Sequence, residues 1–145
     1  MRFMVLMIPG AQKKMEAGVL PDEKLIGAMM KYNEELAKAG VLLALDGLHP
    51  SSKGARIRFS GGKRTVTDGP FTEAREVIGG YWLWQVRSKQ EAIEWASRCP
   101  VQDGDVLELR QVHEMSDFGP EVARDEAALV EEIGKQVEEN KRRAP

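Results

Sequence analysis

Two loops of this sequence carry residue types that can move protons. His49 lies in the segment Asp46-Gly47-Leu48-His49-Pro50-Ser51, where a carboxylate and a hydroxyl are close to the imidazole in sequence. Asp68 is followed by Gly69 and Pro70, which cannot continue a helix or a central strand, so this aspartate lies at a sharp exit from a strand. Histidine works as an acid or base near neutral pH when a carboxylate fixes its tautomer. We therefore predict that His49 and Asp68 form a catalytic acid–base pair, or a polar anchor for a small ligand.

The same two residues also have a purely structural interpretation. In it, His49 is an exposed loop residue and Asp68 accepts hydrogen bonds from nearby backbone amides in a turn. Four further residues are candidates for substrate binding because they lie close to these loops in sequence: Asp46, Ser51, Arg75 and Tyr81. Arg75 could clamp a carboxylate-bearing substrate through paired donors, or it could pair in solvent with Glu73.

Hydrophobic periodicity predicts the elements that must position these residues. Four core strands are expected, at residues 3–8, 41–45, 81–86 and 106–112. One amphipathic helix runs from Pro21 to Gly40, and a second follows Ser88, which forms a capping box with Glu91. A hairpin turning at Gly61-Gly62 is inserted after the second strand. The order is βαββαβ with an insertion, which predicts an α+β domain.

Two helices can cover only one face of such a sheet. The other face must find apolar cover or stay polar, and pairing with a second copy would supply that cover. Side chains alternate along residues 81–86, with Tyr81 on one face and Trp82 on the other. One set should pack under the helices, and the other should line a cavity between two subunits. Glu108 and Arg110 share a face and are predicted to form an ion pair in that interface.

The segment between residues 67 and 81 also resembles a known family. The resemblance rests on residues 67–76 (TDGPFTEARE) and 79–81 (GGY), with AGVL at 39–42, GLHP at 47–50 and LELRQV at 107–112. Together they are similar to the DGPF branch of the YCII-related proteins, over about residues 1–115. The resemblance implies a small bacterial protein of ferredoxin-like topology that pairs as a dimeric α/β barrel. It also implies a homodimer and a superfamily that includes a dehydrochlorinase of hydroxylated aromatics.

One family feature does not carry over to this chain. The better-known YCII-type proteins place their proposed catalytic histidine after strand one, and residues 9–20 contain no histidine here. His49 and Asp68 therefore stand as candidates through their own positions in this sequence. DGPF-type domains accompany extracytoplasmic-function sigma factors, so the resemblance also implies a sigma factor as a candidate partner.

Composition narrows the possible functions. The net charge of −2 gives no electrostatic footprint for nucleic acid, and no apolar run is long enough for a membrane span. The single cysteine, Cys99, excludes an intrachain disulfide and is predicted to be a buried helical side chain. The sequence contains no phosphate-binding loop, dinucleotide fingerprint or zinc-protease motif. We expect a cytoplasmic protein without a metal or a cofactor.

The C-terminal part of the chain has a different character. Residues 121–143 are dense in charge, with Leu129, Ile133 and Val137 forming a narrow apolar stripe. We predict one domain at residues 1–115 and a helical extension of it at residues 116–145. The extension either lies over its own domain or packs on a partner subunit.

Two functions remain open at this point. The first is a cofactor-free enzyme in which His49 and Asp68 move a proton on a small molecule held at the mouth of the barrel. The second is a module without catalysis that senses a ligand or contacts another protein, such as a sigma factor. Replacement of His49 by alanine separates the two, because only the enzyme would lose turnover.

Overall fold

The computed structural model describes residues 1–72 and 74–144, so Glu73, the candidate partner of Arg75, lies outside the described residues. The chain divides into two compact units, residues 1–112 and 113–145. The first unit contains β1 (Arg2–Ile8), α1 (Gln12–Glu16), α2 (Glu23–Lys38), β2 (Leu42–Gly47), η1 (Ser51–Lys53), β3 (Ala55–Ser60), β4 (Lys63–Asp68), β5 (Gly80–Gln85), α3 (Lys89–Ala96) and β6 (Val106–Gln111). The second contains η2 (Met115–Phe118), α4 (Pro120–Asp125) and α5 (Ala127–Arg143).

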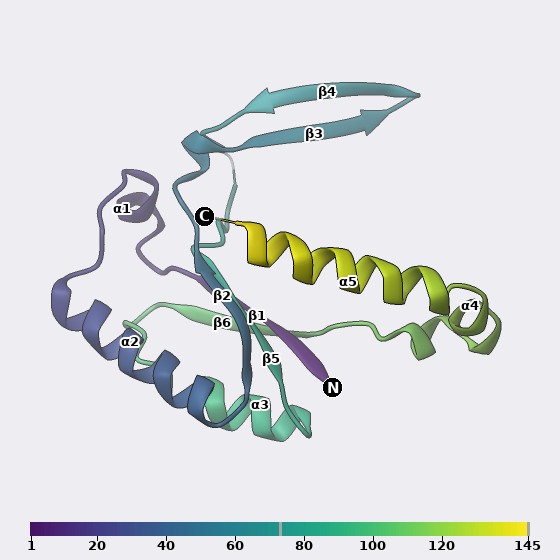
Figure 1. Ribbon diagram of the computed structural model, residues 1–145. Coiled ribbons are helices and arrows are strands. Elements are labelled where there is room, and N and C mark those ends of the chain that lie inside the picture. Colours follow the sequence, from purple (N-terminus) through teal and green to yellow (C-terminus); the bar gives the residue numbers. More distant parts are fainter. Residues whose placement is uncertain (73, 145) are drawn as a thin grey trace. The chain divides into compact units, whose positions relative to one another are not determined.

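The first unit is built on a four-stranded sheet of order β2-β5-β1-β6 (Figure 1). Each neighbouring pair is antiparallel. The two central strands, β1 and β5, are far apart in sequence, and α2 and α3 connect the strands. This arrangement agrees with the predicted βαββαβ order and is consistent with a ferredoxin-like α+β fold.

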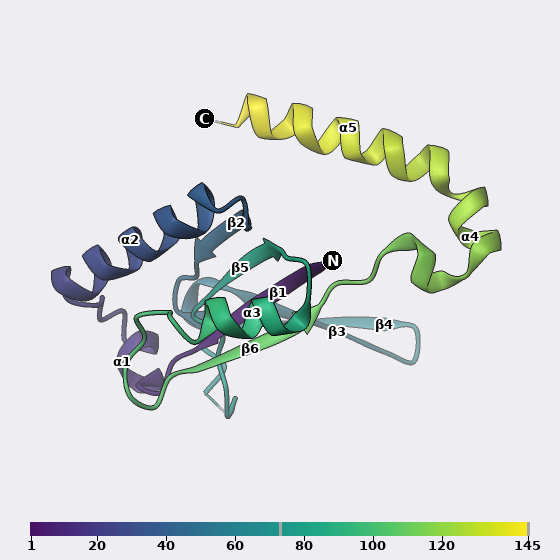
Figure 2. The same cartoon turned by 90° about the horizontal axis from the view of Figure 1, so that it is seen from below.

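One face of the sheet carries the core of the domain. Phe3 lies opposite Trp84, and Val5 lies opposite Trp82; all four are buried. They form one cluster with Tyr32 of α2 and other side chains of α2 and α3, which lie along this face (Figure 2). Of the two sets of side chains that alternate along β5, the one with Trp82 and Trp84 is therefore the set that packs under the helices.

Local signals in the sequence set the ends of both helices. Asp22 caps α2 by accepting a hydrogen bond from the Leu25 amide at 2.8 Å, and Gly40 ends that helix at φ 71°. Ser88 caps α3 through the Glu91 amide at 3.1 Å. Only half of the predicted capping box forms, because the Glu91 carboxylate accepts from the Arg87 amide at 2.8 Å.

The opposite face of the sheet has an apolar centre and a polar margin. Met4 of β1 lies opposite Leu83 of β5, and Leu6 lies opposite Tyr81. On the edge strand β6, Arg110 and Glu108 form an ion pair, with 3.7 Å between Nη1 and Oε2, and its place in a subunit interface stays a prediction. The core cluster, to which α2 and α3 contribute their side chains, lies on the other side of the sheet.

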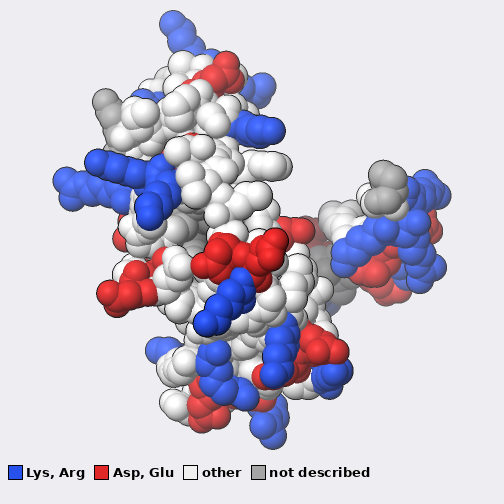
Figure 3. All heavy atoms as spheres, turned by 90° about the vertical axis from the view of Figure 1, so that its left-hand side faces the viewer, with Lys and Arg blue, Asp and Glu red and all other residues white. Residues whose placement is uncertain are grey.

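The hairpin and the second unit lie outside this core. β3 and β4 form a separate two-stranded sheet in which every strand residue is exposed. Lys and Arg side chains gather around it, at the top of Figure 3. In the second unit the predicted single helix is divided at Glu126 into α4 and α5, and the stripe of Leu129, Ile133 and Val137 is exposed.

Candidate functional site

The main hollow of the first unit is a groove at one end of the sheet. Its volume is about 950 Å³, and its walls come from the end of β1, α1, the first half of α2, the exit of β2 and the start of β5. Most of the lining is apolar, including Met7, Met15, Leu25, Met29, Leu45 and Trp82. This volume falls in the range of small-molecule sites, which are mainly apolar with a few polar groups that orient the ligand.

His49 lies on the wall of this groove. It follows β2 in an exposed loop that also brings Leu48 and Pro50 to the groove. The loop is held to the start of β5, because the Leu48 amide donates a hydrogen bond to the Gly79 carbonyl at 2.9 Å. His49 therefore lies at an apolar hollow, in a loop whose backbone is tied to the start of β5.

Asp46 and Tyr81 form a hydrogen-bonded pair in the same lining. They are cross-strand partners of β2 and β5, and the Tyr81 hydroxyl donates to Asp46 Oδ2 at 2.6 Å. This bond to a carboxylate raises the pKa of Tyr81 because it stabilises the protonated phenol. Both residues border the groove, but their side chains extend on the sheet face of Leu6, opposite to that of Trp82, so the neutral phenol and the carboxylate hold each other in place beside the groove.

Ser51 joins three segments of the chain just outside the groove. It is only 7% exposed. Its amide donates to Glu16 Oε1 at 2.9 Å, its hydroxyl donates to Glu16 Oε2, and the same hydroxyl accepts from the Phe71 amide at 3.0 Å. These bonds use the hydroxyl as donor and acceptor at once, so Ser51 links the end of α1 to the loop after β4.

The loop that starts at Asp68 packs directly on this junction. The Gly69 amide donates to the Gly54 carbonyl at 2.9 Å, the Gly69–Pro70 peptide is cis, and the Arg56 guanidinium lies 4.0 Å from the centroid of the Phe71 ring. A Cβ built on Gly69 would lie 1.7 Å from the Ser51 carbonyl oxygen. Only glycine permits this close approach.

The structure does not join His49 to Asp68. Asp68 lies at the base of the hairpin, opposite Ala55, and is exposed. His49 lines the groove and Asp68 does not, and no hydrogen bond or ion pair connects them. Arg75 is likewise exposed and outside the lining. Of the six candidate residues, the groove brings together His49, Asp46 and Tyr81, while Ser51 supports its wall.

Two acidic residues of the site were not predicted from the sequence. Glu16 lines the groove and holds Ser51, and it is the one acid between Pro9 and Leu20. Asp105 also lines the groove and accepts from the amides of Gly10 and Gln102, both at 2.8 Å. A single acid after strand one is a detectable signal for Glu16, whereas the contact of Asp105 with Gly10 depends on the fold.

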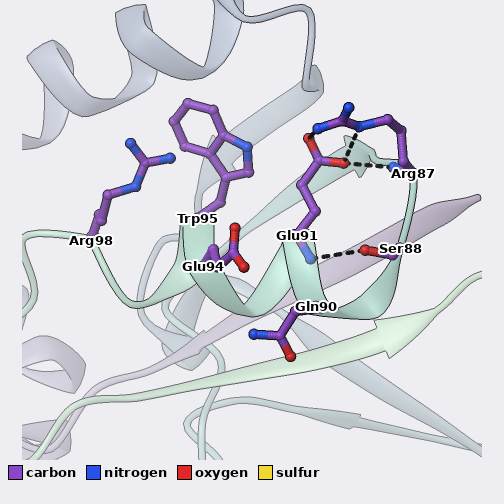
Figure 4. Close-up of a pocket in the computed structure, with 7 residues that line it drawn as sticks. All are labelled: Arg87, Ser88, Gln90, Glu91, Glu94, Trp95 and Arg98. Carbon is purple, nitrogen blue, oxygen red and sulfur yellow. Dashed lines mark hydrogen bonds and ion pairs between the residues drawn. The ribbon is translucent and has the colours of Figure 1, made fainter.

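A second hollow lies on α3 and has a different character. Its lining is mostly polar, and Figure 4 shows Arg87 and Glu91 pointing toward each other at one end of it. Their closest side-chain atoms, Nε and Oε2, are 3.2 Å apart, and the Arg98 guanidinium lies 3.8 Å from the ring centroid of Trp95. The largest charged groups here are already paired or stacked, so the groove at the end of the sheet is the better candidate site.

Within residues 1–72 and 74–144 there is no group of three or more His, Cys, Asp or Glu side chains arranged to hold a metal ion. Within the same residues, none of the helices has the length and apolar character that crossing a bilayer requires.

An antiparallel sheet with two helices on one face and an apolar groove at one end defines a small α+β domain of ferredoxin-like character. Residues 1–116 match the family described as the YCII-related domain, and the chain belongs to this family. It is 32% identical over 75 residues to an uncharacterised protein of Rhizobium meliloti (strain 1021). That match covers 52% of this chain and 60% of the relative.

Proposed function

We propose that this chain binds a small, mainly apolar molecule in the groove at the end of the sheet, and that His49 acts on it as an acid or base. The observation that carries the proposal is the lining itself, an apolar wall that includes His49, with the Asp46–Tyr81 pair at its border. Such a combination suits proton transfer on a substrate that buries its apolar body and exposes one polar group to the imidazole.

We propose further that the chain works as a homodimer of the DGPF branch. The support for the dimer is the sheet face that carries Met4, Leu6 and Leu83, which the helices of the first unit leave uncovered. Pairing of these faces in two subunits would form the α/β barrel that the family resemblance implies. The support for the branch is the segment Asp68-Gly69-Pro70-Phe71, which packs on Ser51.

The groove can be tested with anilinonaphthalene sulfonate, a dye whose fluorescence rises in apolar sites. We expect saturable binding to the wild-type chain and about tenfold weaker binding to Met30→Glu, because loss of one apolar contact and gain of a charge cost about 1.4 kcal/mol or more. Met30 lines the groove and is 62% exposed, so folding should tolerate the change. Ile93→Glu adds the same charge on α3, outside the lining, and is the matched control. Equal dye binding by both variants would refute the site.

The role of His49 is tested by proton exchange. A panel of small aromatic and chlorinated compounds in D2O, followed by NMR, should reveal exchange of a substrate C–H with solvent in the wild-type protein. His49→Gln should lose this exchange while retaining dye binding. Asp68→Asn should retain it, because Asp68 does not line the groove. Loss in Asp68→Asn instead would restore Asp68 as the partner of His49, and absence of exchange in the wild type would favour a ligand-binding role.

A further inference from the structure

The β3–β4 hairpin is exposed along its whole length. Its large apolar side chains, Ile57, Phe59 and Val66, are 56%, 72% and 65% exposed. A two-stranded hairpin is only marginally stable in water without a packing partner, and its outer edges present unpaired backbone groups. The hairpin is therefore a candidate surface for another strand.

The register of the hairpin decides which backbone groups point outward. Gly61 and Gly62 have φ of 56° and 74°, as in a two-residue type I′ turn, and Ser60 lies opposite Lys63. In such a hairpin Ser60 and Lys63 exchange hydrogen bonds, and alternate residues along each strand then point their backbone groups away from the partner strand. On β4 the outward set consists of Arg64, Val66 and Asp68.

This outward set is complementary to itself. Two copies of β4 can pair antiparallel with Val66 of one copy opposite Val66 of the other. In this register Arg64 of each copy lies opposite Asp68 of the other copy, so that an Arg–Asp pair forms at both ends. Thr65 lies opposite the partner's Thr67 on the other face. Opposite charges and paired threonines at directly facing positions stabilise a sheet. In this register the outward N–H and C=O groups of Arg64, Val66 and Asp68 in one copy face the same groups of the other copy.

The edge of β3 lacks this property. Antiparallel pairing of two β3 strands about Ile57 places Arg56 opposite the partner's Arg58, and pairing about Arg58 places two arginines face to face. Like charges at facing positions destabilise a sheet. Charged side chains also protect edges from unwanted pairing, and on β3 the charges serve that purpose.

We propose that the outer edge of β4 pairs antiparallel with β4 of a second copy of this chain, centred on Val66, to form a continuous four-stranded ribbon. The contact uses neither the groove nor the sheet face that carries Leu83, so it is independent of the proposed function. Two six-residue strands bury less area than a standard interface, which implies weak association that depends on concentration.

Charge reversal at the two facing positions tests the pairing by sedimentation equilibrium of the full chain. We expect Arg64→Asp and Asp68→Arg each to weaken the association at least about tenfold, because each change sets like charges against each other at both ends of the ribbon. A mixture of the two single variants should restore it, and so should the double variant, since both positions then carry opposite charges. Arg58→Asp makes the same change of charge on β3, which is not the proposed edge, and should have little effect on the association.

Three results would overturn the pairing. They are a wild-type chain with no association that depends on the hairpin, single variants that associate as strongly as the wild type, and a mixture of the two single variants that does not associate.

A second measurement reports the register. Val66→Cys should form a disulfide-linked dimer on mild oxidation, because facing residues in a sheet have Cα atoms about 4.5–5.5 Å apart. Ile57→Cys on β3 should cross-link more slowly. The native Cys99 is buried and does not compete. Equal cross-linking at both positions would contradict the proposed edge.

Discussion

At the scale of single residues, the pair of Asp46 and Tyr81 allows a direct test of the site. The chain has two tyrosines, and burial raises the pKa of Tyr32 so far that this residue should not ionise before the fold is lost. The first tyrosine titration seen by absorbance near 295 nm should therefore belong to Tyr81. In Asp46→Asn we expect it at lower pH than in the wild type, because the carboxylate no longer stabilises the protonated phenol.

Two variants serve as controls for that titration. Tyr81→Phe should remove the early step, and Tyr32→Phe should leave it in place. The interpretation would fail if the early step persisted in Tyr81→Phe, or if Asp46→Asn titrated at the same pH as the wild type. The titration also reports whether Tyr81 is a neutral donor at the pH where the proposed chemistry occurs.

The sequence identified residues that lie near the groove better than it identified their contacts. Asp46, His49 and Tyr81 were all candidates and all line the groove. The bond between Asp46 and Tyr81 joins residues 35 positions apart and depends on the register of β2 and β5, which periodicity alone does not determine. Glu16, although it is a lone acid after β1, was not selected because its contact with Ser51 depends on the fold.

At the scale of elements, Gly69 decides how the loop after β4 meets η1. Gly69→Ala would place a Cβ 1.7 Å from the Ser51 carbonyl oxygen, so the backbone must move and the hydrogen bonds of the Gly69 and Phe71 amides should weaken. We expect a cost of about 1–3 kcal/mol in local stability. Hydrogen exchange should show faster exchange of the Phe71 amide, with the amides of β1 and β5 unchanged because the core lies elsewhere.

Gly54→Ala is the matched control for this change. A Cβ at Gly54 would lie 3.5 Å from the same Ser51 oxygen, an ordinary contact, and the residue has an extended backbone with φ of −118°. It should therefore leave the Phe71 amide protected. Similar exchange in both variants would show that the close approach of Gly69 does not hold the loop.

Elements with a strong hydrophobic period were predicted well. The four sheet strands, both core helices and the glycine turn of the hairpin appear where the sequence placed them, because burial on one face imposes a regular spacing. The short helix α1 and the division of the C-terminal helix at Glu126 were not predicted, since neither involves a buried stripe. At residue 69 the sequence indicated a glycine that is needed for its freedom in φ. In the structure its φ is not positive, and the glycine is needed because a Cβ would collide with the Ser51 carbonyl oxygen.

At the scale of the whole molecule, the proposed homodimer rests on the sheet face that the core helices α2 and α3 do not cover. Leu83 lies between Met4 and Ala44 on that face and points away from the core, so Leu83→Arg should keep the fold and separate the subunits. Removing a buried leucine costs about 1.5–3 kcal/mol per subunit, and an arginine pair across the interface adds repulsion. Light scattering at micromolar concentration should give twice 16.2 kDa for the wild type and 16.2 kDa for the variant.

Ile93→Arg, on the exposed side of α3, is the control and should remain a dimer. The hairpin variant Asp68→Arg distinguishes the two interfaces, because it should leave the micromolar dimer intact and remove only the weaker step at higher concentration. A monomeric wild type, or a dimer that survives Leu83→Arg, would exclude the sheet face as the subunit interface. If both interfaces form, one chain contacts two others through separate surfaces, and the molecule closes as a tetramer or grows as an open assembly according to the angle between them.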